Sequence, residues 1–162
     1  MADKHAKDTT PAGRSFRVNE HSAAPVERVW EVLVDHARYR EWTPVLRSTL
    51  EANGHPDVNG VGAVRALGTP FYAARERVTV FEPPHRLCYE LVSGLPVTGY
   101  AAEVVLSPSA NGGTHITWTG RFDAAAPGLS GVMLALLHRT IVQTARGLAR
   151  HAAATASPRS AA

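Results

Sequence analysis

The sequence predicts one α+β domain in which a curved antiparallel sheet of seven strands wraps around a long C-terminal helix. Three observations lead to this prediction. A C-terminal stretch keeps a helical apolar period over about five turns. Several β-favouring segments precede it, and two short helical segments follow the first strand. A curved sheet must bury its concave face, and we expect the final helix to fill it because no other predicted helix is long enough.

The sequence pattern of the N-terminal part of the domain predicts one strand followed by two short helices. Residues 15–22 alternate in hydrophobicity, which is typical of a strand with one buried face. A helix follows, because Pro25 suits a first helical turn and apolar residues then recur at helical spacing up to Asp35. A second short helix is expected over residues 36–42, and Pro44 closes it.

Six further strands and one long helix complete the expected order. The strands are predicted at residues 45–52, 62–67, 71–81, 86–92, 97–106 and 114–123. Turn formers such as Asn-Gly, Pro-Pro and Gly-Gly separate them, so the connections are short and the strands form an antiparallel meander. The last helix is expected to open at Pro127, with Gly131 and Gly147 weakening it slightly.

Composition and charge limit the number of domains and the classes of partner that the chain can have. Residues 1–13 and 155–162 are expected to be flexible tails, and residues 14–154 a single domain. The formal charge of +3 comes from scattered basic residues interleaved with acidic ones, so no nucleic-acid partner is expected. With no visible signal peptide or membrane-length apolar stretch, we expect a cytoplasmic protein, either monomer or homodimer, with no integral membrane association. The single cysteine, Cys88, excludes an intrachain disulfide and is expected to be a buried structural thiol.

Several local phrases resemble one superfamily when taken in order. They are Ala24-Pro25-Val26-Glu27-Arg28-Val29-Trp30, Tyr39-x-x-Trp42-x-Pro44, Arg75-Glu76-Arg77-Val78, Phe81-Glu82-Pro83-Pro84 and Gly112-Gly113-Thr114-x-Ile116-x-Trp118. They resemble the START-like superfamily, also called SRPBCC or the birch-pollen-allergen fold, in its polyketide cyclase/dehydrase and lipid-transport-like branch. The resemblance implies a helix-grip fold with a cavity for a small hydrophobic ligand between the sheet and the last helix. Relatives include cyclases, lipid carriers, hormone receptors and oxygenase domains, and the chain lacks the Cys-x-His spacing of the oxygenases.

Strand and helix periodicity predict the walls of that cavity. Side chains two apart on a strand share a face, so Val78 and Val80 are expected to face inward together with Glu76. The ligand pocket is expected to be lined by Trp30, Arg40, Trp42, Tyr72, Tyr89, Leu91, Ala102, Trp118, Phe122, Met133, Leu137 and Ile141.

Glu76, Arg65 and Tyr100 are the candidates for chemistry. A carboxylate on an apolar strand face is costly to bury, and its raised pKa would suit a general acid or base or a ligand hydrogen bond. Glu76 can instead be a structural partner of Arg40 or Arg65. The hormone-receptor branch is similar here, with a pocket glutamate in an equivalent Arg-Glu-Arg phrase. Cyclases of this fold use an arginine and neighbouring polar groups to polarise a carbonyl, and Arg65 and Arg40 are the candidate arginines here. The acid/base pair would be Glu76 with Tyr100 or Arg65.

Function classes remain open at this point. The eight histidines show no metal-ligand spacing, and no phosphate loop is present, so no metal and no cofactor are expected. A non-catalytic carrier or sensor of a hydrophobic metabolite needs only the cavity. A cofactor-independent cyclase or dehydratase acting on a polyketide-like substrate also needs an acid/base group. A protein-interaction module would require an exposed apolar patch.

Overall fold

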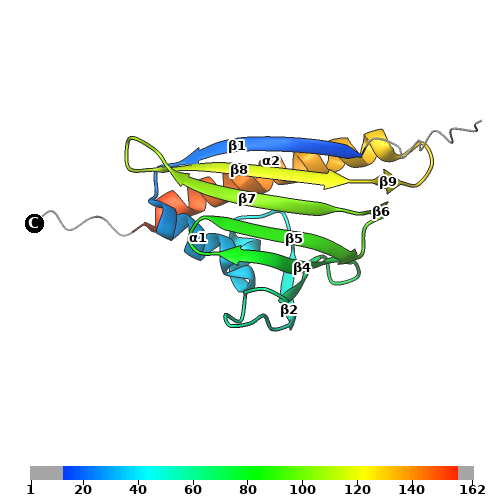
Figure 1. The fold of residues 1–162 in the computed structure, drawn as a ribbon, viewed down its shortest axis with the longest axis horizontal. Helices are drawn as coiled ribbons and strands as arrows, with labels where there is room; N and C mark the ends of the chain where they lie inside the picture. Colours follow the sequence, from blue (N-terminus) through cyan, green and yellow to red (C-terminus); the bar gives the residue numbers. More distant parts are fainter. Residues whose placement is uncertain (1–12, 157–162) are drawn as a thin grey trace, which may run out of the picture.

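The computed structural model of the protein describes residues 13–156. Its elements, in chain order, are β1 (Arg14–Ser22), α1 (Val26–Val34), the 3-10 helix η1 (His36–Glu41), β2 (Arg47–Ala52), β3 (Val64–Gly68), β4 (Ala73–Glu82), β5 (Arg86–Ser93), β6 (Val97–Thr98), β7 (Ala101–Pro108), β8 (Thr114–Phe122), β9 (Ala124–Ala125) and α2 (Ser130–Thr155) (Figure 1). The tails expected at residues 1–13 and 155–162 lie almost entirely outside the described residues.

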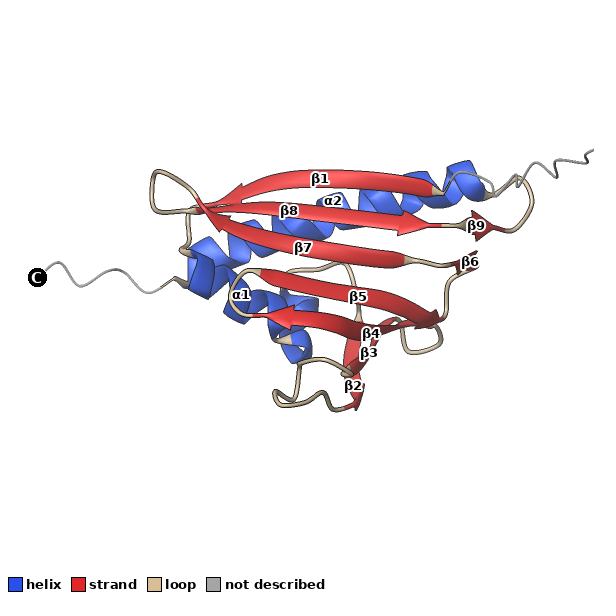
Figure 2. Cartoon of the chain, viewed as in Figure 1, coloured by secondary structure: helices blue, strands red, loops and turns tan. Residues whose placement is uncertain are grey.

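The large sheet has seven antiparallel strands in the order β1-β8-β7-β5-β4-β3-β2. The helix α2 runs along one face of this sheet, with α1 and η1 near its C-terminal half (Figure 2). The predicted α+β helix-grip fold is therefore confirmed. Within residues 13–156, no helix combines the length and the apolar character that a membrane span requires.

The strand expected over residues 97–106 is divided in two. Gly99 has a φ of 64°, a left-handed conformation, and a Cβ there would collide with the side chain of Asp123. The short β6 before this break leaves the large sheet and pairs with β9, while β7 after it pairs with β5 and β8.

A β-bulge in β4 corrects one expectation about which side chains face inward. Val78 pairs with Tyr89, but Val80 pairs with Cys88 and Phe81 with Leu87, so one extra residue is inserted between the first two pairs. The alternation therefore shifts by one after Val78. Contrary to the expectation, Val80 does not share the face of Val78. Phe81 packs edge-on against Trp30, with ring centroids 5.1 Å apart.

The helix α2 begins later than predicted and packs more closely at its C-terminal half. Pro127 lies in a turn in which Gly128 has a φ of 77°, so the helix starts only at Ser130. Further along, Gly147 is buried against the end of η1, where a Cβ would collide with the carbonyl oxygen of Trp42. Gly147 thus permits a close helix approach, although its sequence position alone indicated only a weak point in the helix.

Replacing Gly147 tests this close approach. Gly147→Ala is expected to lower the free energy of unfolding by about 1–3 kcal/mol, because the added methyl group must push α2 away from Trp42. The control is Gly131→Ala, on the same helix, where nothing lies near the added carbon and helix propensity favours alanine. Urea unfolding measures both variants, and an equal effect of the two substitutions would contradict the packing argument.

Candidate ligand-binding site

A cavity of about 240 Å³ lies between the concave face of the sheet and the N-terminal half of α2. Strands β3, β4, β5 and β8, together with Tyr100 just before β7, form one wall, and helix α2 forms the other. The residues lining the cavity are Tyr39, Thr43, Val45, Arg65, Leu67, Ala74, Glu76, Tyr89, Leu95, Tyr100, Trp118, Leu136, Leu137, Thr140, Ile141 and Thr144. Its walls are mainly apolar, and the charged side chains on it are Arg65 and Glu76.

Arg65 and Glu76 form a buried ion pair in the sheet wall of the cavity. They are directly opposite each other on β3 and β4, so their side chains lie on the same face. The Arg65 Nη2 and Glu76 Oε2 atoms are 3.0 Å apart, and Nε donates to the same oxygen at 3.1 Å. The two residues are only 6% and 9% exposed. Of the two partners considered for Glu76, Arg65 is therefore the one present, and Arg40 is exposed on η1.

Hydrogen bonds and aromatic rings hold Arg65 in place. Its Nη1 donates to the Tyr39 hydroxyl at 2.7 Å, and that hydroxyl donates to the carbonyl oxygen of Leu33 at 2.6 Å. The guanidinium carbon lies 4.6 Å from the ring centroid of Tyr89. Trp118 Nε1 in turn donates to the Tyr89 hydroxyl at 3.0 Å. The arginine is thus fixed by contacts to four elements, η1, β4, β5 and, through Tyr89, β8.

Burial changes the titration of these groups. Burial raises the pKa of the Glu76 carboxyl above its ordinary value, and the charge of Arg65 offsets part of this effect. Burial likewise raises the pKa of Tyr100, and the negative charge of Glu76 raises it further. Tyr100 and Glu76 therefore share one electrostatic environment in the cavity.

One oxygen of Glu76 is left for a ligand. Both contacts from Arg65 go to Oε2, and among the described residues Oε1 has no hydrogen-bond partner. Glu76 lines the cavity, so this oxygen is a candidate contact for a molecule inside it. An ionised carboxylate would accept a hydrogen bond there, and a protonated one would donate it.

The structure brings together some of the residues predicted for the site and places others elsewhere. Those that line the cavity are Arg65, Glu76, Tyr89, Tyr100, Trp118, Leu137 and Ile141. Those that lie in the hydrophobic core or pack against it, outside the lining, are Trp30, Trp42, Leu91, Ala102, Phe122 and Met133. Arg40 is exposed, and Tyr72 is 56% exposed in the turn before β4, where its backbone bonds to Thr69.

Other lining residues had not been assigned to the pocket from the sequence. They include Tyr39, Thr43, Val45, Leu67 and Leu95. Most of these lie in η1 or in loops, where neither strand alternation nor helical period applies. For Tyr39 the signal was present in the Tyr-x-x-Trp phrase, since the two rings pack together with centroids 4.7 Å apart.

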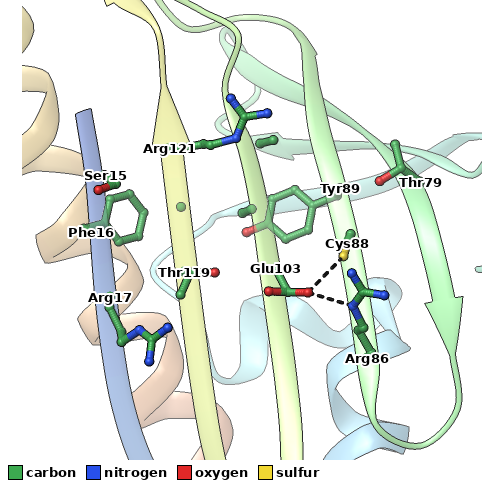
Figure 3. A pocket seen from close by; sticks show the side chains of 13 residues that line it. Ser15, Phe16, Arg17, Thr79, Arg86, Cys88, Tyr89, Glu103, Thr119 and Arg121 are labelled. Carbon is green, nitrogen blue, oxygen red and sulfur yellow. Dashed lines mark hydrogen bonds and ion pairs between the residues drawn. The ribbon is translucent and has the colours of Figure 1, made fainter. Parts of the chain in front are cut away.

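A second, larger hollow of about 670 Å³ lies on the opposite, outer face of the sheet (Figure 3). There Glu103 accepts a hydrogen bond from Arg86 Nε at 2.7 Å and lies 3.8 Å from the Cys88 sulfur. Burial raises the pKa of the Cys88 thiol, so the reactive thiolate is disfavoured. The side chains of Arg86 and Glu103 are partly exposed to solvent and pair with each other, whereas the charged groups of the inner cavity are buried. We therefore regard the smaller inner cavity as the candidate site.

No cluster of metal-ligating residues is found in the part of the chain that the structure describes. Groups of three or more histidine, cysteine, aspartate or glutamate side chains close enough to hold an ion do not occur within residues 13–156.

The protein thus has a helix-grip fold with a cavity between its sheet and α2. The sequence matches the family described as "Polyketide cyclase / dehydrase and lipid transport" over residues 14–153. The chain belongs to this family, which confirms the resemblance to the START-like superfamily.

Solved structures similar to this chain share its fold. A START superfamily protein from Mycobacterium smegmatis has a TM-score of 0.75 and 14% identity, covering 88% of this chain and 99% of that one. The Zhui aromatase/cyclase from Streptomyces sp. R1128 has a TM-score of 0.71 and 20% identity, covering 86% and 93%. The protein XoxI from Bacillus cereus has a TM-score of 0.70 and 19% identity, covering 85% and 94%. No curated protein matches the sequence.

The pH dependence of stability tests the electrostatics of Glu76. A carboxyl whose pKa is raised on folding contributes stability that is fully present below the ordinary value of 4.5 and is lost as the pH rises through the folded-state pKa. The free energy of unfolding of the wild type, minus that of Glu76→Gln, should therefore fall as the pH rises from about 4 to about 8.

Urea unfolding at several pH values measures this difference. The matched control is Glu90→Gln, because Glu90 also faces an arginine across β4 and β5 but is exposed on the outer face. Its difference from the wild type should vary little over the same range. If this difference instead rises with pH for Glu76→Gln, the attraction of Arg65 lowers the pKa of Glu76 by more than burial raises it.

Proposed function

We propose that the protein binds one small hydrophobic molecule in the cavity between the sheet and α2. The observation that carries this proposal is the form of the cavity, in which mainly apolar walls enclose one buried ion pair, Arg65–Glu76. Binding sites for small molecules are commonly apolar clefts with a few fixed polar groups that orient the ligand. The family description, which joins cyclases with lipid transport, supports the same class of ligand.

The apolar body of the ligand would replace water along the walls. Leu67, Leu95 and Leu137 would cover it from three different segments of the chain. Its polar group would meet Oε1 of Glu76 or the hydroxyl of Tyr100, since both residues line the same cavity. Leu136 lines the cavity and is also 52% exposed, so the ligand would enter beside the N-terminal half of α2.

Catalysis at the same site is a second candidate, favoured by the raised pKa of Glu76. A carboxyl shifted toward neutral pH can donate or accept a proton during carbonyl chemistry, with Arg65 and Tyr100 polarising the carbonyl. The protein would then be a cofactor-independent cyclase or dehydratase acting on a polyketide-like compound. A carrier or sensor would use the same contacts without proton transfer.

Filling the cavity tests the binding proposal. A neutral fluorescent dye no larger than two fused rings should bind the wild type at one site, and native mass spectrometry should show a one-to-one complex. Thr140→Phe should weaken this binding at least about tenfold, because its ring would occupy the cavity. The control is Gln143→Phe, one turn along α2 on the exposed side. Absence of dye binding, or equal binding by both variants, would contradict the proposal.

Turnover separates the catalytic candidate from the carrier. If Glu76 transfers a proton, Glu76→Gln should still bind the dye but should form product from a short poly-β-ketone that fits the cavity about a hundredfold more slowly, as followed by mass spectrometry. A carrier would give no product above the uncatalysed background with either protein. Equal turnover by wild type and variant would exclude Glu76 as the acid or base.

A further inference from the structure

The size of the cavity limits what it can enclose, if the proposed function holds. An apolar protein cavity of about 150 Å³ holds one benzene molecule, so a cavity of about 240 Å³ corresponds to about ten non-hydrogen atoms. Two fused rings have this size. A polyketide with four rings, or a long acyl chain, exceeds it and would have to project through the opening beside Leu136.

The walls of the cavity are held in place, which makes this limit meaningful. Tyr89 is fixed by the hydrogen bond from Trp118 and by an edge-to-face contact with that ring at an angle of 84°. Arg65 is fixed by Glu76 and Tyr39. On the helix side, Leu137 and Ile141 belong to the packed core. Enlarging the cavity would therefore require breaking buried hydrogen bonds or moving α2.

The charge of the site limits the polar group of the ligand. Arg65 is the one cation among the lining residues, and Glu76 already compensates it at 3.0 Å. A ligand carboxylate would place a second negative charge beside Glu76 in a poorly solvated space. A hydroxyl would instead donate to the free Oε1 without adding charge.

We propose that the cavity selects an uncharged compound of one or two fused rings, about ten non-hydrogen atoms in all, with a hydroxyl group on one edge that donates a hydrogen bond to Glu76. This inference rests on the proposed function and names the class of ligand for the same site. Glu76 balances the charge of Arg65, so the arginine does not attract an anionic ligand.

Calorimetric titration with phenol, 2-naphthol and 2-anthrol tests the size limit. 2-Naphthol should bind the wild type at least about tenfold more tightly than phenol, because the second ring buries more apolar surface. 2-Anthrol should bind no more tightly than 2-naphthol, since its third ring has no room. A further tenfold gain for 2-anthrol would overturn the size limit while leaving the proposed function intact. Failure of all three compounds to bind would overturn the proposed function and the inference together.

A comparison of 2-naphthol with 2-naphthoate tests the charge preference. At about pH 8 the hydroxyl of 2-naphthol is neutral and the carboxyl group of 2-naphthoate is ionised. The wild type should bind 2-naphthol at least about tenfold more tightly than 2-naphthoate. Equal or tighter binding of 2-naphthoate by the wild type would overturn the preference, and this comparison needs no variant.

Glu76→Gln should reverse the preference, because Arg65 then lacks its compensating charge and can pair with the ligand carboxylate. Glu90→Gln, which removes an exposed carboxylate paired with Arg77, should keep the wild-type order. Circular dichroism confirms that each variant is folded before titration. A folded Glu76→Gln variant that keeps the wild-type order would show that Glu76 does not set the preference.

Discussion

The structure depends on how one helix covers the concave face of a seven-stranded sheet. The C-terminal half of α2 carries small residues on its buried side, including Ala145, Gly147 and Ala149, which let the helix lie close to its neighbours. The Ser22 hydroxyl also donates to the carbonyl oxygen of Ala149 at 2.8 Å, which ties β1 to the helix. Toward its N-terminus the buried side changes to larger or polar residues, and the cavity lies there. The cavity is therefore a consequence of close packing at one end of α2 and looser coverage at the other.

The Arg65–Glu76 pair is the costly feature within this arrangement. Taking two charges out of water carries a desolvation penalty that their attraction repays only when the geometry is good and other hydrogen bonds are satisfied. Here Tyr39 and Tyr89 support the guanidinium, yet one oxygen of Glu76 receives no hydrogen bond from the described residues. An apolar pair of similar volume would close the sheet without this cost. The proposed ligand contact would account for a pair that the packing of the sheet does not require.

The sequence predicted the fold well because its signals were local and in order. Alternation, helical period and turn formers each act over a few residues, and together they gave the seven-stranded sheet and the long helix. The bulge in β4 was not predicted, because the extra residue between Val78 and Val80 is visible only in the pairing with β5. The start of α2 at Ser130 was also missed, since it depends on the left-handed conformation of Gly128.

For the site, the sequence identified the unusual residue but could not choose its partner. Strand alternation placed Glu76 on an apolar face, whereas Arg40 and Arg65 were equal candidates until the β3–β4 register put Arg65 directly opposite. Tyr39 and Leu95 reach the cavity from η1 and from a loop, where no periodic rule applies.

Binding and catalysis would make the same demands on this cavity. Both require the ligand to be held with its polar edge at Glu76, and both benefit from the rigid support that Tyr39, Tyr89 and Trp118 give to the arginine. A family that joins cyclases with lipid transport is physically reasonable on these grounds. An enzyme differs from a carrier only in that a group in the cavity transfers a proton to or from the bound molecule. In this chain the carboxyl that would move it is already buried beside a cation, with one oxygen unpaired among the described residues. The fold supplies the enclosure, and the difference between the two functions then lies in the reactivity of the bound molecule toward one carboxyl group.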